Sequence, residues 1–126
     1  HPGCKFLMMA AQFNIDVVSQ LQEIIPRSEY TVPSFIIKEL KNIKGRSKGK
    51  NRLAASTALK IASMPPLKIK EIPMLEGELV DDALLRISKV IGTNDRELRK
   101  KARIKGIIII YLRQRKYLAI DGYLKI

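Results

Sequence analysis

The sequence has very few of the side chains on which most enzyme chemistry depends. Its 126 residues include one cysteine (Cys4), one histidine (His1) and no tryptophan. A single cysteine can form neither an internal disulfide nor a cysteine-based zinc site, and one terminal histidine excludes a Ser–His–Asp triad. With no leader-like segment ahead of Cys4, we expect a reducing, cytoplasmic location. Any chemistry must therefore use carboxylates, hydroxyls, amines or a metal ion that they hold.

Long apolar runs and aromatic residues are also scarce. No apolar run is longer than Ile107–Leu112, whereas a membrane-spanning helix needs about 20 apolar residues, so we expect no membrane partner. Aromatic residues make up 6% of the chain, too few for a platform on which bases could stack.

Acidic residues are outnumbered two to one. Twelve Asp and Glu face 24 Lys and Arg, which gives a net charge of +12. An excess of this size attracts polyanions, and nucleic acid is the commonest of these. The 46% of apolar residues is enough for one domain, residues 1–126, with its own core. The composition therefore favours a single basic domain with RNA or another polyanion as its partner.

Apolar spacing predicts that helices and strands alternate along the chain. The expected helices are residues 13–25, 34–43, 53–62, 79–88 and 96–105, and the expected strands are 29–33, 67–72, 90–92 and 107–112. Gly106 is expected in the left-handed conformation that ends a helix. Residues 41–52, which are rich in Lys, Arg and Gly and contain no acid, are expected to form a mobile, solvated connection.

The β-branched run Ile107–Leu112 is typical of a strand buried on both faces in a parallel sheet. Together with the alternation of helices and strands, it predicts an α/β fold. We expect a three-layer α/β/α sandwich around a central, mainly parallel sheet, with functional residues at the carboxyl ends of the strands.

Acidic residues follow several of these strands. Glu39 lies on the helix after the first strand, Asp81 and Asp82 open a later helix, and Asp95 follows residues 90–92. Carboxylates that converge without His or Cys favour Mg²⁺ or Mn²⁺, which can activate water against a phosphodiester. The alternative is that each acid only complements a helix dipole or caps a helix, which is a common arrangement.

Several motifs together resemble those of the PIN-domain nucleases. They are Phe6–Asp16, Val32–Leu40, Glu78–Leu85, Thr93–Arg99 and Ile109–Arg113. The order of these blocks is most similar to the archaeal and eukaryotic branch that processes rRNA for the small ribosomal subunit. The resemblance implies a PIN-like domain and a metal-dependent endoribonuclease that acts on structured or single-stranded RNA such as pre-rRNA. It also implies one or two Mg²⁺ or Mn²⁺ ions, a homodimer and ribosome-assembly proteins as partners.

The resemblance also assigns roles to individual residues. Glu39, Asp81 and Asp95 become the catalytic acids that hold the metal, with Asp82 as the neighbour of Asp81 or its substitute. Thr93 and Asn94 would then hydrogen-bond a ligand carboxylate or the metal-bound water. The alternative for these last two is a plain turn that caps the next helix.

The sequence departs from the family pattern at two places. The family opens with an apolar strand that ends in an acid, and neither the strand nor this first acid is present in the sequence ahead of Phe6. The spacing from Asp81 to Thr93 is also shorter than in the family, by about one turn of helix. We therefore expect a site of three acids unless a further segment supplies the first.

Two groups of basic residues are candidates for RNA contact through phosphates. The first comprises Lys44, Arg46, Lys48, Lys50 and Arg52, and the second comprises Arg96, Arg99, Lys100 and Arg103. The alternative for both groups is a solvated loop and a solvated helix face.

Two other functions remain open. One is a non-catalytic RNA-binding protein of ribosome assembly with a degenerate PIN site. The other is the toxin of a toxin–antitoxin pair, which is also PIN-like but is disfavoured by the Val32–Leu40 block and the basic segment after it.

Overall fold

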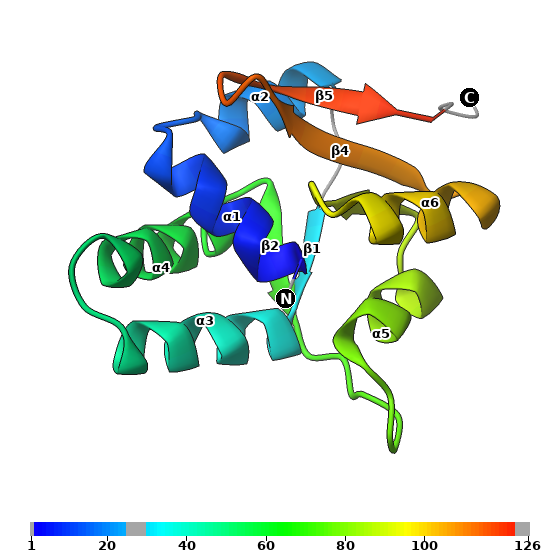
Figure 1. Cartoon of the computed structure of the whole chain (residues 1–126), viewed down its shortest axis with the longest axis horizontal. Helices are drawn as coiled ribbons and strands as arrows, with labels where there is room; N and C mark the ends of the chain where they lie inside the picture. The colour runs from blue at the N-terminus through cyan, green and yellow to red at the C-terminus, as the bar shows by residue number, and fades with distance from the viewer. Residues whose placement is uncertain (1, 25–29, 123–126) are drawn as a thin grey trace.

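The computed structural model describes residues 2–24 and 30–122 of the chain (Figure 1). Its helices are α1 (Pro2–Gln12), α2 (Val17–Ile24), α3 (Ser34–Arg46), α4 (Gly49–Ala62), α5 (Val80–Ile87) and α6 (Arg96–Ile104). Its strands are β1 (Tyr30–Pro33), β2 (Leu67–Lys70), β3 (Val90–Gly92), β4 (Ile108–Arg113) and β5 (Tyr117–Asp121). None of the helices in these two ranges is both long enough and apolar enough to cross a membrane.

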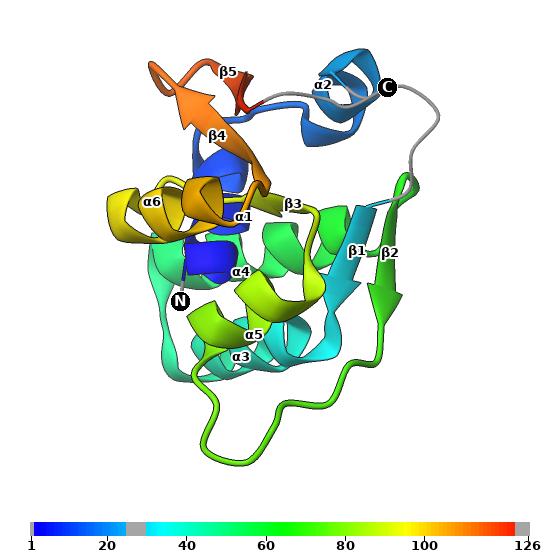
Figure 2. The ribbon, with the colours of Figure 1, turned by 90° about the vertical axis from the view of Figure 1, so that its right-hand side faces the viewer.

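The described strands form two hydrogen-bonded groups (Figure 2). β1 pairs with β2 in parallel, with Tyr30 opposite Leu67 and Pro33 opposite Lys70. In the second group, β3 pairs in parallel with β4, and β4 pairs antiparallel with β5. The α/β class and the mainly parallel pairing are confirmed, but among residues 2–24 and 30–122 no strand joins the two groups to each other.

Side chains of β4 face two separate apolar clusters, one on each side of the sheet. Ile110 and Leu112 pack with residues of α1, α2, α3 and α4 in the first cluster. Ile109 packs with residues of α5 and α6 in the second. Because the side chains of a strand alternate between its faces, helices cover β4 on both sides. This arrangement gives the three predicted layers.

The helices near the N-terminus differ from the prediction. α1 was not expected, yet it buries Phe6, Leu7 and Ala10 on one face. The helix predicted from Phe13 begins only at Val17, because Asn14 turns the chain with a φ of 54° and Asp16 accepts a hydrogen bond from the Ser19 amide (3.1 Å). Residues 25 and 29, at the predicted ends of a helix and a strand, lie outside the described residues.

The basic segment 41–52 is helical, so the prediction of a mobile connection is wrong. α3 continues to Arg46 and α4 starts at Gly49, which leaves a link of Ser47 and Lys48. The alanines of α4 are buried, and they let this helix pack closely against α1 and α3. Burial of this face stabilises both helices despite the charges and glycines on their exposed sides.

β5 is the strand that the sequence analysis missed. It returns from β4 through a tight turn in which Gln114 and Arg115 have φ values of 55° and 56°. Such turns normally carry Gly, Asn or Asp at these positions, so the usual sequence signal was absent. Gly106 has the predicted left-handed conformation, with a φ of 74°.

Candidate functional site

The segment Thr93–Asp95 joins β3 to α6 and is held by side-chain hydrogen bonds. The Thr93 side chain is fully buried, and its Oγ1 accepts a hydrogen bond from the Asp95 amide (3.1 Å). The Thr93 amide itself donates to the Ile110 carbonyl (2.9 Å) and so continues the ladder between β3 and β4. Thr93 therefore fixes the backbone from which the Asp95 side chain projects.

Asn94 bonds with both backbone groups of one residue on β4. Its Nδ2 donates to the Leu112 carbonyl (2.9 Å), and its Oδ1 accepts from the Leu112 amide (2.8 Å). The side chain thus takes the place of a strand residue at the end of the ladder. Both ends of the Asn94 side-chain amide are therefore engaged by β4, and the residue that caps α6 is Asp95.

Replacing Asn94 tests this role. We expect Asn94→Ala to lower the free energy of unfolding by about 2–4 kcal/mol, because two backbone groups of Leu112 lose their partner at a part-buried position. Chemical denaturation of both proteins measures the change. Asn94→Asp is the matched control. It keeps the acceptor for the Leu112 amide but loses the donor, so its free energy of unfolding should lie between those of the parent protein and Asn94→Ala. Equal stability of all three proteins would contradict this role.

Asp95 caps α6. Its Oδ1 accepts a hydrogen bond from the Leu98 amide (2.9 Å), and the side chain is exposed. This cap within the described helix α6 involves Oδ1, so the second carboxylate oxygen of Asp95 can bind another partner. An acid at this position also faces the positive end of the helix dipole.

Asp81 lies in the first turn of α5 and is brought near Asp95. Its pKa is raised above the usual value of 3.8, chiefly because the carboxyl group is partly buried and secondly because of the negative charge of Asp95. The positive charge of Lys101 acts in the opposite direction. The fold therefore places two carboxylates, from the starts of two helices, within electrostatic range of each other.

The other two predicted acids are placed differently. Asp82 is exposed beside Asp81. Glu39 is half-buried on α3, where its Oε1 accepts a hydrogen bond from Arg46 Nη2 (3.2 Å). Within residues 2–24 and 30–122, no group of three or more acidic, His or Cys side chains is arranged to hold a metal ion. The structure thus brings Asp81 and Asp95 together and leaves Glu39 in an ion pair.

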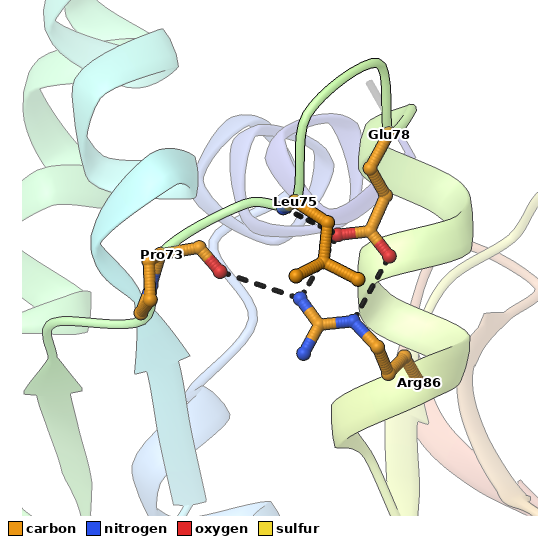
Figure 3. Close-up of polar contacts among 4 residues, drawn as sticks. All are labelled: Pro73, Leu75, Glu78 and Arg86. Atoms are coloured by element: carbon orange, nitrogen blue, oxygen red, sulfur yellow. Dashed lines mark hydrogen bonds and ion pairs between the residues drawn. The ribbon is translucent and has the colours of Figure 1, made fainter.

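A loop ahead of α5 is tied back to that helix (Figure 3). Arg86 donates to both carboxylate oxygens of Glu78 at 2.9 Å and to the Pro73 carbonyl at 3.3 Å. Glu78 Oε1 also accepts from the Leu75 amide (3.1 Å). The hydrogen bonds from Arg86 hold the pKa of Glu78 below its usual value. Arg86 belongs to no motif of the sequence, yet its contacts fix the entry into the helix that carries Asp81.

The predicted basic residues lie on two separate helical surfaces, one at the link between α3 and α4 and the other on α6. In the first group, Lys48 and Lys50 are exposed at the link between α3 and α4, and Arg52 donates to the Lys44 carbonyl at the end of α3 (3.1 Å). In the second group, on α6, Arg99 and Arg103 contact Asp121 at 3.1 and 3.5 Å.

Arg99 also lies over the Tyr111 ring, 4.1 Å from its centroid. Both arginines therefore fasten α6 to β4 and β5, while Arg96 and Lys100 remain exposed. Asp121 belongs to none of the sequence motifs. Its ion pairs with Arg99 and Arg103 separate these two arginines from the exposed Arg96 and Lys100.

Asp81 and Asp95 fit a hard divalent cation. Mg²⁺ is commonly bound by one or two carboxylates and keeps several waters, so a pair of acids is a sufficient protein contribution. A carboxylate whose ionisation is opposed by a second one, as that of Asp81 is by Asp95, is also a place where a cation can bind. The donor set contains oxygen only, which excludes a preference for soft metals.

Comparison with known proteins identifies the architecture. Residues 3–115 match a family described as PIN like domain. The chain belongs to the PIN-domain family. This membership accounts for the alternation of helices and parallel strands.

Two curated relatives of the PIN-domain chain are archaeal. Ribonuclease VapC9 of Archaeoglobus fulgidus is 32% identical over 110 residues, which cover 84% of this chain and 76% of the relative. Ribonuclease VapC4 of Methanocaldococcus jannaschii is 29% identical over 131 residues, which cover 96% and 95%. Neither name refers to rRNA processing, so the finer branch suggested by the motifs is not established by these relatives.

A solved structure shows the same fold. The PIN domain endonuclease Utp24 superposes with a TM-score of 0.70 over 98% of this chain and 90% of that chain, at 19% identity. At this level of identity the likeness concerns the arrangement of helices and strands. The predicted α/β sandwich is thereby confirmed as a PIN-type fold.

Proposed function

We propose that this chain is an endoribonuclease that hydrolyses a phosphodiester of RNA at Asp81 and Asp95. The observation that carries the proposal is the meeting of these two carboxylates, from α5 and α6, in a chain of the PIN-domain family. The names of the two relatives, both ribonucleases, support the reaction class.

The proposed cofactor is Mg²⁺ or Mn²⁺, held by Asp81 and Asp95. When bound, such an ion supplies a water of lowered pKa and polarises the phosphate. Thr93 keeps Asp95 in place through the backbone amide, and the ion pair of Arg86 with Glu78 fixes the start of the helix that carries Asp81. Glu39 and Asp82 are further candidate ligands, and Glu39 would have to leave Arg46 to take part.

The substrate that we propose first is pre-rRNA, on the strength of the motif blocks around Val32–Leu40 and Thr93–Arg99. The proposed partners are RNA, a second copy of the chain and, in rRNA processing, ribosome-assembly proteins; the expected location is the cytoplasm. The two VapC relatives favour a second candidate, a ribonuclease that acts on RNA outside rRNA processing.

A cleavage assay separates these proposals. The purified chain with Mn²⁺ is offered a labelled pre-rRNA fragment, a tRNA and an mRNA of matched length. Cleavage of the pre-rRNA alone supports the processing role, and preferred cleavage of another RNA supports the second candidate. If the protein binds all three RNAs but cuts none with Mn²⁺ or Mg²⁺, the enzymatic proposal fails and the non-catalytic alternative replaces it.

The exposed lysines at the link between α3 and α4 are expected to contact the RNA backbone. Because each phosphate contact releases a counterion, Lys48→Ala and Lys50→Ala should each lower the slope of log affinity against log salt by about 1 unit or less. Titrations at several salt concentrations measure this slope. Lys60→Ala, at the far end of α4 and also exposed, is the control and should leave it unchanged. Unaltered slopes for the first two variants would contradict the proposed contact.

A further inference from the structure

The two sides of α6 face different parts of the fold. Figures 1 and 2 show β4 and β5 on one side of this helix and α5 on the other. Arg99 and Arg103 point toward the first side, where they contact Asp121 of β5. Residues of α5 and α6 pack together in one apolar cluster. The α5 side is also the side of Asp81, which lies in the first turn of α5.

Helical geometry places Lys101 on the side of α6 that faces α5. Successive side chains of an α-helix are about 100° apart around its axis. Measured from the buried Leu98, Arg99 lies about 100° to one side, and Lys101 lies about 60° to the other. The remaining basic residues of the helix line a groove beside Asp121; they are Arg96, Arg99, Lys100 and Arg103. Lys101 is thus set apart from the other basic residues of α6.

The positive charge of Lys101 acts on the pair of carboxylates. Burial and the charge of Asp95 raise the pKa of Asp81, and Lys101 counteracts them. A side chain on a helix is tilted toward the N-terminus of that helix, so Lys101 leans toward the turn that holds Asp95. Among the described residues, none of the ion pairs includes Lys101. Its ammonium group is therefore available to a ligand at the two carboxylates.

A phosphodiester at this site brings a charge that Lys101 can balance. Two ionised carboxylates are neutralised by one divalent cation, so the single negative charge of a phosphodiester needs a further positive group. When water attacks phosphorus, additional negative charge develops on the non-bridging oxygens. A positive group that is already in place stabilises this developing charge more than it stabilises the bound substrate, and it therefore raises kcat.

We propose that Lys101 is a further catalytic residue, whose ammonium group contacts a non-bridging oxygen of the scissile phosphate. This inference rests on the proposed function of RNA hydrolysis at Asp81 and Asp95. In that reaction the bond from the water oxygen to phosphorus forms, the bond from phosphorus to the leaving oxygen breaks, and a proton of the water passes through solvent to the leaving oxygen. Lys101 keeps its own proton throughout, so its role is electrostatic.

Lys101→Met tests this role, because it removes the charge and keeps an unbranched side chain at an exposed position. We expect kcat for RNA cleavage with Mn²⁺ to fall at least about 10-fold while KM changes little, since the charge acts mainly in the transition state. Lys101→Arg should recover most of the rate. Lys105→Met is the matched control and should keep the parent kcat. It removes the same charge from the same helix, about 6 Å further along the axis from Asp95.

Binding of Mn²⁺ gives a second measurement, which does not depend on cleavage. A positive charge beside two carboxylates opposes a cation, so Lys101→Met should bind Mn²⁺ about two- to fivefold more tightly than the parent protein. Lys105→Met should bind it like the parent. Thermal unfolding of each variant shows whether its fold is retained.

The outcomes separate this proposal from the proposed function. If the parent protein cleaves RNA and Lys101→Met keeps the parent kcat or the parent affinity for Mn²⁺, only the role of Lys101 is wrong. Lys101 would then be a solvated partner of Glu97, one turn before it on α6. A higher KM at unchanged kcat would likewise overturn the proposal and make Lys101 a contact of the RNA backbone. If the parent protein cleaves no RNA, the proposed function fails, and the role of Lys101 fails with it.

Discussion

Asp95→Asn is expected to reduce RNA cleavage by at least about 100-fold, since even residues that only support a metal ligand change metal affinity or activity about 10–100-fold. The substitution removes the negative charge that the proposed Mg²⁺ or Mn²⁺ requires. It keeps the side-chain oxygen that caps α6, because Asn caps helices about as well as Asp does. The loss should therefore appear in the cleavage rate with Mn²⁺, while the melting temperature of the variant is no lower than that of the parent protein, because the repulsion between Asp95 and Asp81 is also removed.

Asp16→Asn is the matched control for this experiment. Asp16 likewise stands just before a helix and accepts a hydrogen bond from an amide three residues on, that of Ser19 (3.1 Å). It lies ahead of α2 and is not part of the candidate site. Asp16→Asn should cleave RNA at the parent rate. If Asp95→Asn also cleaved at the parent rate, Asp95 would be only a helix cap and the assigned site would be wrong.

The part of the fold that could be predicted depended on local signals. The buried strand at Ile109 and Ile110 was visible because β-branched residues follow one another without polar interruption. The helix after Asp95 was visible because an acid precedes a periodic segment and Gly106 follows it. In both cases the tertiary structure agrees with what neighbouring residues favour, so sequence reasoning was sufficient.

The parts that failed depend on partners distant in the sequence. α4 is helical around its basic start because its alanines pack on α1 and α3, and no local pattern in residues 41–52 reveals that packing. The turn that leads into β5 contains neither Gly nor Asn at its two positive-φ positions. Asp121 of β5 forms ion pairs with Arg99 and Arg103. Two of the four arginines and lysines predicted for RNA on α6 thus have structural partners.

In the candidate site, too, some residues follow from local signals and others depend on partners elsewhere in the fold. Asp81 and Asp95 were identifiable because each opens a helix after a strand or turn, and topology brings such positions to one edge. The pairing of Glu39 with Arg46 could not be foreseen, since the segment containing Arg46 was expected to be a loop. As part of a helix, Arg46 lies two turns beyond Glu39 on the same side and within reach of its carboxylate.

Asp81→Asn is expected to abolish cleavage and at the same time to stabilise the folded protein. Burial and the charge of Asp95 raise the pKa of Asp81 above 3.8, the value expected in the unfolded chain. Between 3.8 and the raised pKa, the folded protein binds more protons than the unfolded chain. The free energy of unfolding therefore falls as the pH rises through this window and stays lower above it. A neutral Asn removes that cost, so the variant should melt at a higher temperature at pH 7.

Thermal unfolding with and without Mn²⁺ measures the binding of a cation to the two carboxylates. A cation held by both would offset, in the parent protein, the loss of stability that comes from ionised Asp81 beside Asp95. At a concentration of 100 times its dissociation constant, a ligand of the folded state adds about 2.7 kcal/mol to stability. Mn²⁺ should thus raise the melting temperature of the parent protein and have little effect on Asp81→Asn. Glu76→Gln, which removes an exposed charge shortly before α5, is the control and should respond to Mn²⁺ like the parent. An Asp81→Asn protein that melts lower than the parent at pH 7 would show that burial and the charge of Asp95 do not destabilise ionised Asp81. A variant that gains as much from Mn²⁺ as the parent would show that Asp81 is not a metal ligand.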